Sequence, residues 1–228
     1  MFPISDTKHD RGGIPIFNLT LVAITIFVFY TQFTSRDTNA LINAYSLIPK
    51  NINFLDIESL LPFVTSIFLH GGIFHIASNM WFLWIFGDNI EKELGPIKFL
   101  MLYLISGIAG SFLQYILNPT SPIPMIGASG AVSGIMAAYL VMFPKHTIKS
   151  FVFIVFLITI VNIPAIFYIG YWFLLQLLNG VVNLPGKFQS DQGGVAFFAH
   201  VGGFIMGLIL AKIFQSKNKD FIEGKLVD

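Results

Sequence analysis

The chain has 228 residues, of which 55% are hydrophobic and only 11% are charged, and its mean hydropathy is +0.75. Soluble domains carry about 25% charged residues, so this composition excludes an ordinary soluble protein and predicts one embedded in the lipid bilayer. The net charge of +1 gives no reason to expect a nucleic-acid partner, and the absence of cysteine excludes disulfides, thiolate metal sites and cysteine nucleophiles.

Long uncharged stretches indicate membrane spans, because a helix needs about 20 apolar residues to cross the hydrocarbon core. The stretch 99–144 is long enough for two spans, and Asn118-Pro-Thr-Ser-Pro-Ile-Pro124 breaks it in the middle. We therefore predict an all-α, polytopic membrane protein. Its six expected transmembrane helices lie at residues 14–34, 68–87, 98–117, 128–143, 159–182 and 194–213.

Lysine and arginine are distributed unequally between the two sides of this arrangement. With the N-terminus inside, ten of them lie on the inside and three on the outside, which predicts that both termini are cytoplasmic. Residues 1–13 then form a cytoplasmic segment without a cleavable signal, and residues 14–213 form the six-helix core with an external loop at 35–67. Residues 214–228 form a cytoplasmic tail.

The stretch 150–186 allows two interpretations. It could hold one long span, or a short in-plane segment at 150–163 followed by a span that starts near Pro164. Pro164 and Gly170 should weaken this fifth span. We expect it to be the mobile one if the protein admits a substrate helix.

Three groups of polar residues lie within the predicted spans, where polar side chains cost energy and need a reason. The first comprises His75 and Asn79, which are four residues apart at the start of the second span and therefore share a helix face. His70 lies nearer the outer mouth of the bundle. On their own, these residues fit helix–helix hydrogen bonding as well as they fit catalysis.

Ser129 belongs to the second group and opens the fourth span between Gly127 and Gly130. Free backbone N–H groups and the helix dipole favour negative charge at such a position. Gly-x-Ser-Gly alone is a weak pattern, because small residues are frequent where membrane helices pack together. Ser133, one turn later, is assigned to such packing.

His200 forms the third group and lies about one turn into the sixth span. It is next to a strip of small residues, Ala199, Gly203 and Gly207, that repeats every four positions and allows close helix packing. A lone histidine here would more often be structural. The second, fourth and sixth spans run in the same direction, however, so all three polar groups are expected at a similar depth below the outer surface.

Together these groups can perform acyl transfer. A serine hydroxyl becomes a nucleophile when a base takes its proton, and His200 could take it from Ser129. The side chains of Asn79 and His75 and the backbone N–H of Ser129 could donate to the oxyanion of the tetrahedral intermediate. No Asp or Glu lies within a span near these residues, so a Ser–His dyad is expected, with His200 held by the glycine-rich packing of its own helix.

Over residues 60–212 the sequence resembles the rhomboid family of intramembrane serine proteases. The resemblance rests on five features taken together: His70, the H-x-x-x-N of His75 and Asn79, Glu91 followed by Gly95, the G-x-S-G at 127–130, and A-H-x-x-G-x-x-x-G at 199–207. It implies a six-helix rhomboid-like bundle and cleavage of membrane-anchored proteins in or near their transmembrane segments. It also implies a preference for small residues before the cut, and neither cofactor nor metal.

Carried over by position, the resemblance implies that Ser129 is the nucleophile, that His200 is the general base, and that His75 and Asn79 support the oxyanion. It implies a structural role for Glu91, which would tie down the turn after the second span. The positions expected to support the site are His70, Gly127, Gly130, Gly203 and Gly207.

Two positions depart from the family pattern. Many members have Trp-Arg in the first external loop, where this chain has Pro62 and Phe63. Some bacterial members have a tyrosine four residues after the nucleophile that stacks on the histidine. Here that position is Ser133, so another group must position His200.

Three other functions compete with proteolysis. A non-catalytic rhomboid-like protein would bind membrane-protein clients, but such proteins usually lose the serine or the histidine. A haem protein with His70, His75 or His200 as axial ligands would leave G-x-S-G unexplained, and a transporter would predict charged groups within the spans. We therefore expect a serine endopeptidase of the bacterial inner membrane that acts on transmembrane protein substrates within the lipid bilayer, with no oligomeric state indicated.

Overall fold

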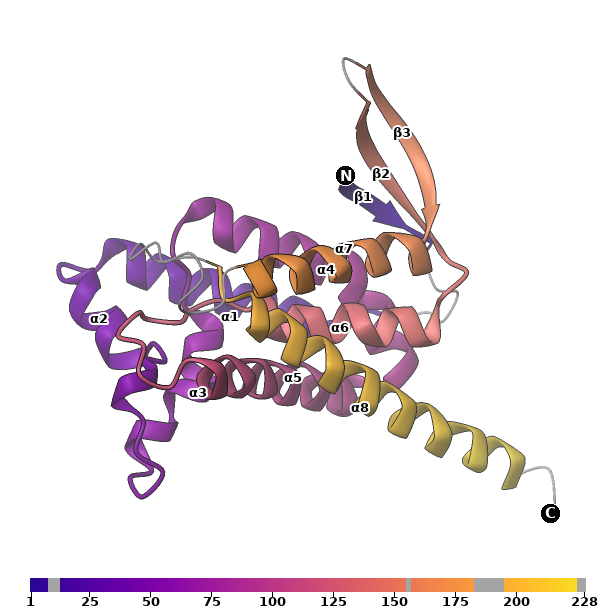
Figure 1. Ribbon diagram of the computed structural model, residues 1–228. Helices are drawn as coiled ribbons and strands as arrows, with labels where there is room; N and C mark the ends of the chain where they lie inside the picture. Colours follow the sequence, from indigo (N-terminus) through magenta and orange to yellow (C-terminus); the bar gives the residue numbers. More distant parts are fainter. Residues whose placement is uncertain (8–12, 155–156, 183–194, 225–228) are drawn as a thin grey trace.

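The computed structural model describes residues 1–7, 13–154, 157–182 and 195–224, and most of them are helical (Figure 1). The prediction of a mostly helical membrane bundle is confirmed. The long helices are α1 (Ile16–Thr34), α4 (Ile73–Leu94), α5 (Pro96–Leu117), α6 (Ser129–Met142), α7 (Ala165–Val182) and α8 (Phe197–Gly224). They correspond in order to the six expected spans, although α4 begins and ends later than 68–87 and α8 continues past residue 213.

Four helices in the described part of the chain are long and apolar enough to cross a membrane: α1, α5, α7 and residues 197–215 of α8. Helix α4 gives a fifth candidate together with the preceding segment Glu58–Phe68, from which it is bent by 80°. Helix α6 has only 14 residues, and most of its side chains are buried. It is therefore surrounded by other helices, whereas α1 and α7 expose large apolar side chains such as Phe27 and Phe167, as lipid-facing helices do.

The external loop is folded against the bundle. It contains α2 (Thr38–Tyr45), α3 (Pro62–Thr65) and three short 3-10 turns, η1 (Pro49–Asn51), η2 (Glu58–Leu60) and η3 (Ser66–Phe68). Phe63, at one of the two positions that depart from the family pattern, is buried and lies 6.2 Å from the ring centroids of both Phe112 and Tyr115 in α5. This aromatic cluster fixes the loop on α5.

A three-stranded antiparallel sheet at one end of the bundle is an addition to the expected all-helical chain. Its strands lie in the order β1 (Phe2–Asp6), β2 (Thr147–Ile154) and β3 (Leu157–Pro164), with Thr147 paired to Pro164, and Figure 1 shows the β2–β3 hairpin projecting away from the helices. Residues 159–164 are therefore strand, and the expected start of the fifth span at 159 is wrong. Pro164 ends the strand instead of weakening a helix.

The residue composition of 157–164 explains why a strand lies where the start of the fifth span was expected. An apolar run alone does not distinguish a strand from a buried helix, and the span was assigned from its lack of charge. The run Leu157–Pro164 is rich in β-branched residues, which favour strands. Of the two interpretations of 150–186, the one with a helix starting near Pro164 has the correct boundary, although the preceding segment is a hairpin.

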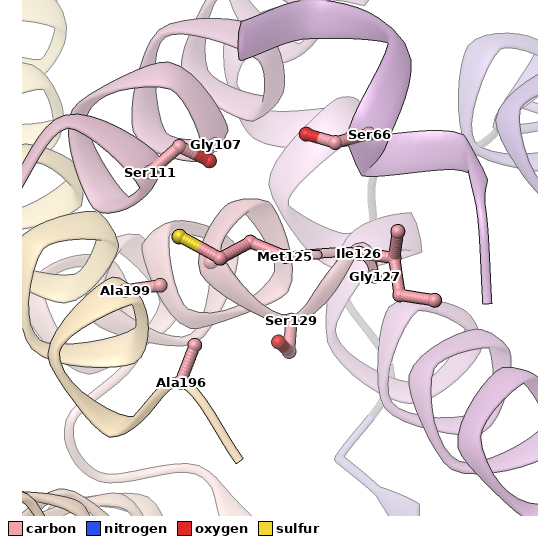
Figure 2. Close-up of a pocket in the computed structure, with 10 residues that line it drawn as sticks. Ser66, Gly107, Ser111, Met125, Ile126, Gly127, Ser129, Ala196 and Ala199 are labelled. Atoms are coloured by element: carbon pink, nitrogen blue, oxygen red, sulfur yellow. The ribbon is translucent and has the colours of Figure 1, made fainter. Parts of the chain in front are cut away.

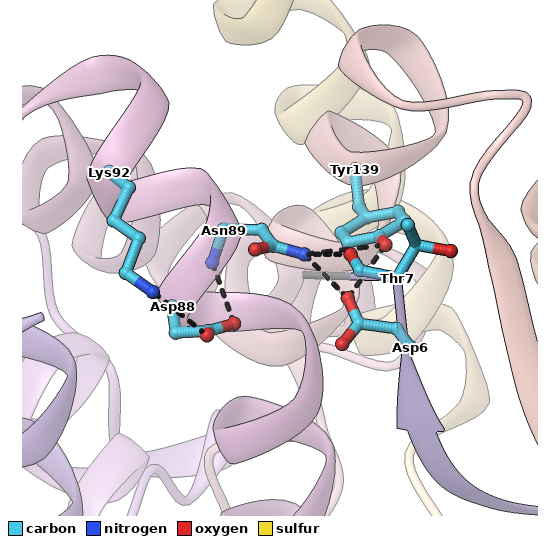
Figure 3. Close-up of polar contacts among 6 residues, drawn as sticks. All are labelled: Asp6, Thr7, Asp88, Asn89, Lys92 and Tyr139. Atoms are coloured by element: carbon cyan, nitrogen blue, oxygen red, sulfur yellow. Dashed lines mark hydrogen bonds and ion pairs between the residues drawn. The ribbon is translucent and has the colours of Figure 1, made fainter. Parts of the chain in front are cut away.

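Asp6 ties β1 to two helices at once (Figure 3). Its Oδ2 accepts hydrogen bonds from the hydroxyl of Tyr139 in α6 and from Nδ2 of Asn89 in α4, both at 2.6 Å. Burial raises the pKa of Asp6 to about 6, with a further increase from the charge of Asp88, although the hydrogen bond from Tyr139 opposes it. The N-terminal strand is thus held by a carboxylate whose ionisation is unfavourable at this position.

Glu91 binds the start of the first helix. Its two carboxylate oxygens accept from the backbone N–H groups of Phe17 at 3.0 Å and Asn18 at 2.7 Å. Glu91 was expected to tie down the turn after the second span, and its backbone carbonyl accepts from the N–H of Gly95 in that turn at 2.8 Å. Its side chain has a further structural contact, because it reaches across to α1, where free N–H groups and the helix dipole favour a carboxylate. The turn itself is made by Gly95, whose φ of 81° lies in the left-handed region.

We predict that Glu91→Gln lowers the free energy of unfolding by about 2 kcal/mol, because α1 loses a charge-assisted cap that accepts two backbone hydrogen bonds. The measurement is thermal or denaturant unfolding of the protein in detergent. The matched control is Glu58→Gln, which makes the same change in the exposed external loop. Equal losses of stability in the two variants would contradict the capping role.

We also predict that Asp6→Asn stabilises the fold at neutral pH. The pKa of Asp6 is raised from 3.8 to about 6, so the folded protein binds the proton more tightly than the unfolded chain and wild-type stability falls as pH rises through this window. Asparagine keeps an acceptor for Tyr139 and Asn89 without the charge. Melting temperatures across the window should therefore fall less in the variant, and identical pH profiles would be evidence against this effect.

Candidate active site

Ser129 and His200 are in direct contact. Ser129 is the first residue of α6, and His200 lies one turn after α8 begins. The Oγ of Ser129 is 2.7 Å from Nε2 of His200, and the imidazole is 8% exposed. A hydroxyl and an imidazole nitrogen at this distance can exchange a proton directly.

Glycines bring these two residues together. A Cβ atom added at Gly203 in α8 would collide with the backbone of Gly130 in α6, and one added at Gly207 would collide with the backbone of Gly134. The two helices therefore touch backbone to backbone over two successive turns, as small-xxx-small pairs do. Any side chain at these positions would push the imidazole away from the hydroxyl.

Helix α7 contacts the other side of the imidazole. The Oε1 of Gln176 is 2.7 Å from Nδ1 of His200, and the ring of Trp172 stacks on the imidazole at a centroid distance of 5.9 Å and 28°. The glycine packing positions α8, whereas these two side chains contact the ring and are the groups that stand in for the missing tyrosine at Ser133. Neither was predicted, although an amide within an apolar helix and an aromatic residue four positions earlier were visible in the sequence.

Gly127 leads into Ser129 and has two reasons to be glycine. Its φ of 123° lies in the left-handed region, and a Cβ atom there would be 2.6 Å from Nε2 of His75 and 3.8 Å from Nδ2 of Asn79. His75 and Asn79 therefore lie directly beside the loop that carries Ser129.

Asn79 offers a free donor at this place. The side chain is 6% exposed, and within the described ranges of the chain its Nδ2 has no hydrogen-bond partner. Buried polar atoms in proteins are nearly always hydrogen-bonded, so an unpaired buried amide beside the loop that carries Ser129 calls for an explanation. An oxygen atom bound beside Gly127 would provide the missing acceptor.

His70 holds the loop that precedes Ser129. The ring is fully buried, and its Nε2 lies 3.4 Å from the backbone nitrogen of Ala128. The side chain of Gln32 in α1 binds both backbone groups of His70, donating to the carbonyl at 2.6 Å and accepting from the N–H at 3.1 Å. His70 thus links the first helix to the loop that ends at Ser129.

A small pocket opens beside Ser129 (Figure 2). Its wall combines glycines and alanines with three serines and the side chains of Met125 and Ile126. The residues that line it are Ser66, Gly107, Ser111, Met125, Ile126, Gly127, Ser129, Gly130, Ala196 and Ala199. Among the described residues, no three histidine or carboxylate side chains converge into a group that could hold a metal ion.

The chain is similar to known proteins of one family. A model of the rhomboid domain matches residues 58–217. RHOMBOID-like protein 1 of Arabidopsis thaliana is 30% identical over 89% of this chain and 52% of its own length, and the rhomboid protease GluP of Bacillus subtilis is 31% identical over 57% and 25%. The mitochondrial presenilin-associated rhomboid-like protein of mouse is 33% identical over 64% and 36%. The chain thus spans about half the length of the Arabidopsis relatives, and the extent of the domain match shows that it belongs to the rhomboid family.

Proposed function

We propose that this protein is an intramembrane serine endopeptidase that hydrolyses peptide bonds in or near the transmembrane segments of other membrane proteins. The observation that carries the proposal is the 2.7 Å contact between the Ser129 hydroxyl and Nε2 of His200 inside a bundle of membrane helices. Family membership supports it, since one relative is named as a protease. A protein that only bound membrane clients would have no use for this contact.

The chemistry proceeds in two steps. In the first, Nε2 of His200 takes the hydroxyl proton of Ser129 while the oxygen bonds to the scissile carbonyl carbon. The C–N bond then breaks, and His200 returns the proton to the leaving amine. In the second step, His200 takes a proton from water while the water oxygen bonds to the acyl carbon. The C–O bond to Ser129 then breaks, and His200 returns the proton to the Ser129 oxygen, which releases the new carboxyl end.

Each tetrahedral intermediate carries an oxyanion that needs donors aimed at it before the reaction begins. The unpaired amide of Asn79 is the strongest candidate because no reorganisation of an existing hydrogen bond is needed. The ring of His75 and the backbone N–H of Ser129, at the start of α6, complete the set. All three belong to the surroundings of Gly127.

The surroundings of the site suggest a substrate and an orientation. The pocket beside Ser129 is small, and glycines, alanines and serines form most of its wall, which favours a small residue before the cut. With ten of the thirteen lysine and arginine residues on the inner side of the six spans, both termini face the cytoplasm. We place the protein in the inner membrane of a bacterial cell, with the residues around Ser129 toward the outer half.

The direct test is cleavage of a model transmembrane substrate and labelling of the purified protein by a fluorophosphonate. We expect Ser129→Ala to abolish both while the protein stays folded, because the hydroxyl is the attacking group. Ser133→Ala, a serine one turn later in the same helix, should retain both and serves as the control. His200→Ala should behave like Ser129→Ala. Cleavage by Ser129→Ala at the wild-type rate would rule the proposal out.

A second prediction concerns Asn79. If its amide is one oxyanion donor among several, Asn79→Ala should lower kcat by about 100-fold. An interaction made only in the transition state changes kcat with little effect on KM, so the two constants should be measured separately on the same substrate. A loss confined to KM would assign Asn79 to substrate binding instead.

A further inference from the structure

The imidazole of His200 has a partner on each of its two nitrogens. Nε2 faces Ser129 and Nδ1 faces Oε1 of Gln176, both at 2.7 Å. Gln176 lies in α7 and is only partly exposed, within a helix whose other residues are mostly apolar. An amide in such a helix needs a polar partner, and this contact provides one.

Proton counting fixes the roles of the two contacts. A neutral imidazole carries one proton, so one nitrogen donates and the other accepts. If Ser129 is to give its proton to Nε2, that nitrogen must be bare and Nδ1 must carry the proton. The Nδ1–H group then needs an acceptor, and the carbonyl oxygen of the Gln176 amide lies in the right position.

We infer, on the basis of the proposed function, that Gln176 is the positioning residue of the dyad: it accepts from Nδ1–H and fixes both the tautomer and the orientation of His200. In water-soluble triads a carboxylate performs this task. A buried carboxylate would be costly within a membrane, whereas a neutral amide supplies an acceptor without a charge.

The inference also assigns a role to α7 as a whole. Trp172, one turn before Gln176, stacks on the same imidazole, and Phe173 stacks on Phe204 of α8 with ring centroids 4.2 Å apart. The side chains of Trp172, Phe173 and Gln176 therefore hold α7 against α8. The base is therefore fully oriented only while α7 is packed on α8, so the helix expected to move for substrate entry also carries the group that completes the dyad.

The test compares Gln176→Leu, which has no acceptor, with Gln176→Glu, which has one. The matched control is Asn179→Leu, which removes another amide of α7, one whose Nδ2 donates to the backbone of Leu175. Two quantities are measured on the full-length purified protein: the rate of fluorophosphonate labelling of Ser129, and the tautomer of His200 from nitrogen NMR of ¹⁵N-histidine protein, assigned with His200→Ala.

We expect Gln176→Leu to slow labelling by about 100-fold, the size of effect that misplacing a catalytic group can have. The Nδ1–H signal of His200 should also weaken in this variant. Gln176→Glu should restore most of the rate and keep the Nδ1–H tautomer, and Asn179→Leu should match the wild type. A merely structural Gln176 would instead give slow labelling in both Gln176 variants with an unchanged tautomer.

That result, or an unchanged rate and tautomer in Gln176→Leu, would overturn the inference. Failure of the proposed function looks different, because the wild-type protein would then not be labelled at all. In that case the NMR spectra of the wild type and Gln176→Leu still decide whether Gln176 sets the tautomer of His200.

Discussion

The backbone contact between α6 and α8 is the constraint on which the site depends. Two glycines on each helix, Gly130 and Gly134 against Gly203 and Gly207, leave no room for a Cβ atom on α8. Lipid provides no hydrophobic force between helices, so close packing of this kind is a main source of their association. It sets the separation of the two helix axes and thereby allows Ser129 and His200 to lie at hydrogen-bond distance.

Neutral amide side chains make several of the hydrogen bonds around the contact between α6 and α8. Gln32 binds the backbone of His70, Gln176 binds the ring of His200, and Asn79 leaves a free donor beside Gly127. Each does in an apolar bundle what a charged group can do in water, since an amide avoids the larger desolvation cost of a charge. A charged exception is Glu91, which lies near the end of α4 and accepts hydrogen bonds from the N-terminus of α1.

The sequence predicts those features of the fold that depend on a residue pattern within a single helix. Lack of charge located the helices, and the four-residue spacing of Gly203 and Gly207 predicted the packing face. Contacts between distant segments were not readable in the same way. Gln176 is 24 residues from His200, and its contact depends on how α7 rotates against α8. The hairpin before α7 was missed because apolar strands and apolar helices differ little in hydropathy.

The hairpin matters because it is continuous with α7, the helix whose Gln176 contacts the imidazole of His200. Ala165 begins α7 directly after β3, donates its N–H to the carbonyl of His146 at 2.8 Å and is fully buried. Along the rest of α7, an exposed face that includes Phe167, Leu174 and Leu178 lies opposite buried residues such as Tyr168 and Ile169, and Ala165 is held in place by its own backbone hydrogen bond. A displacement of α7 that keeps Ala165 in place must therefore be largest toward its far end. Gln176 lies eleven residues beyond Ala165, so an outward swing of α7 about Ala165 would move the Gln176 amide away from the imidazole of His200.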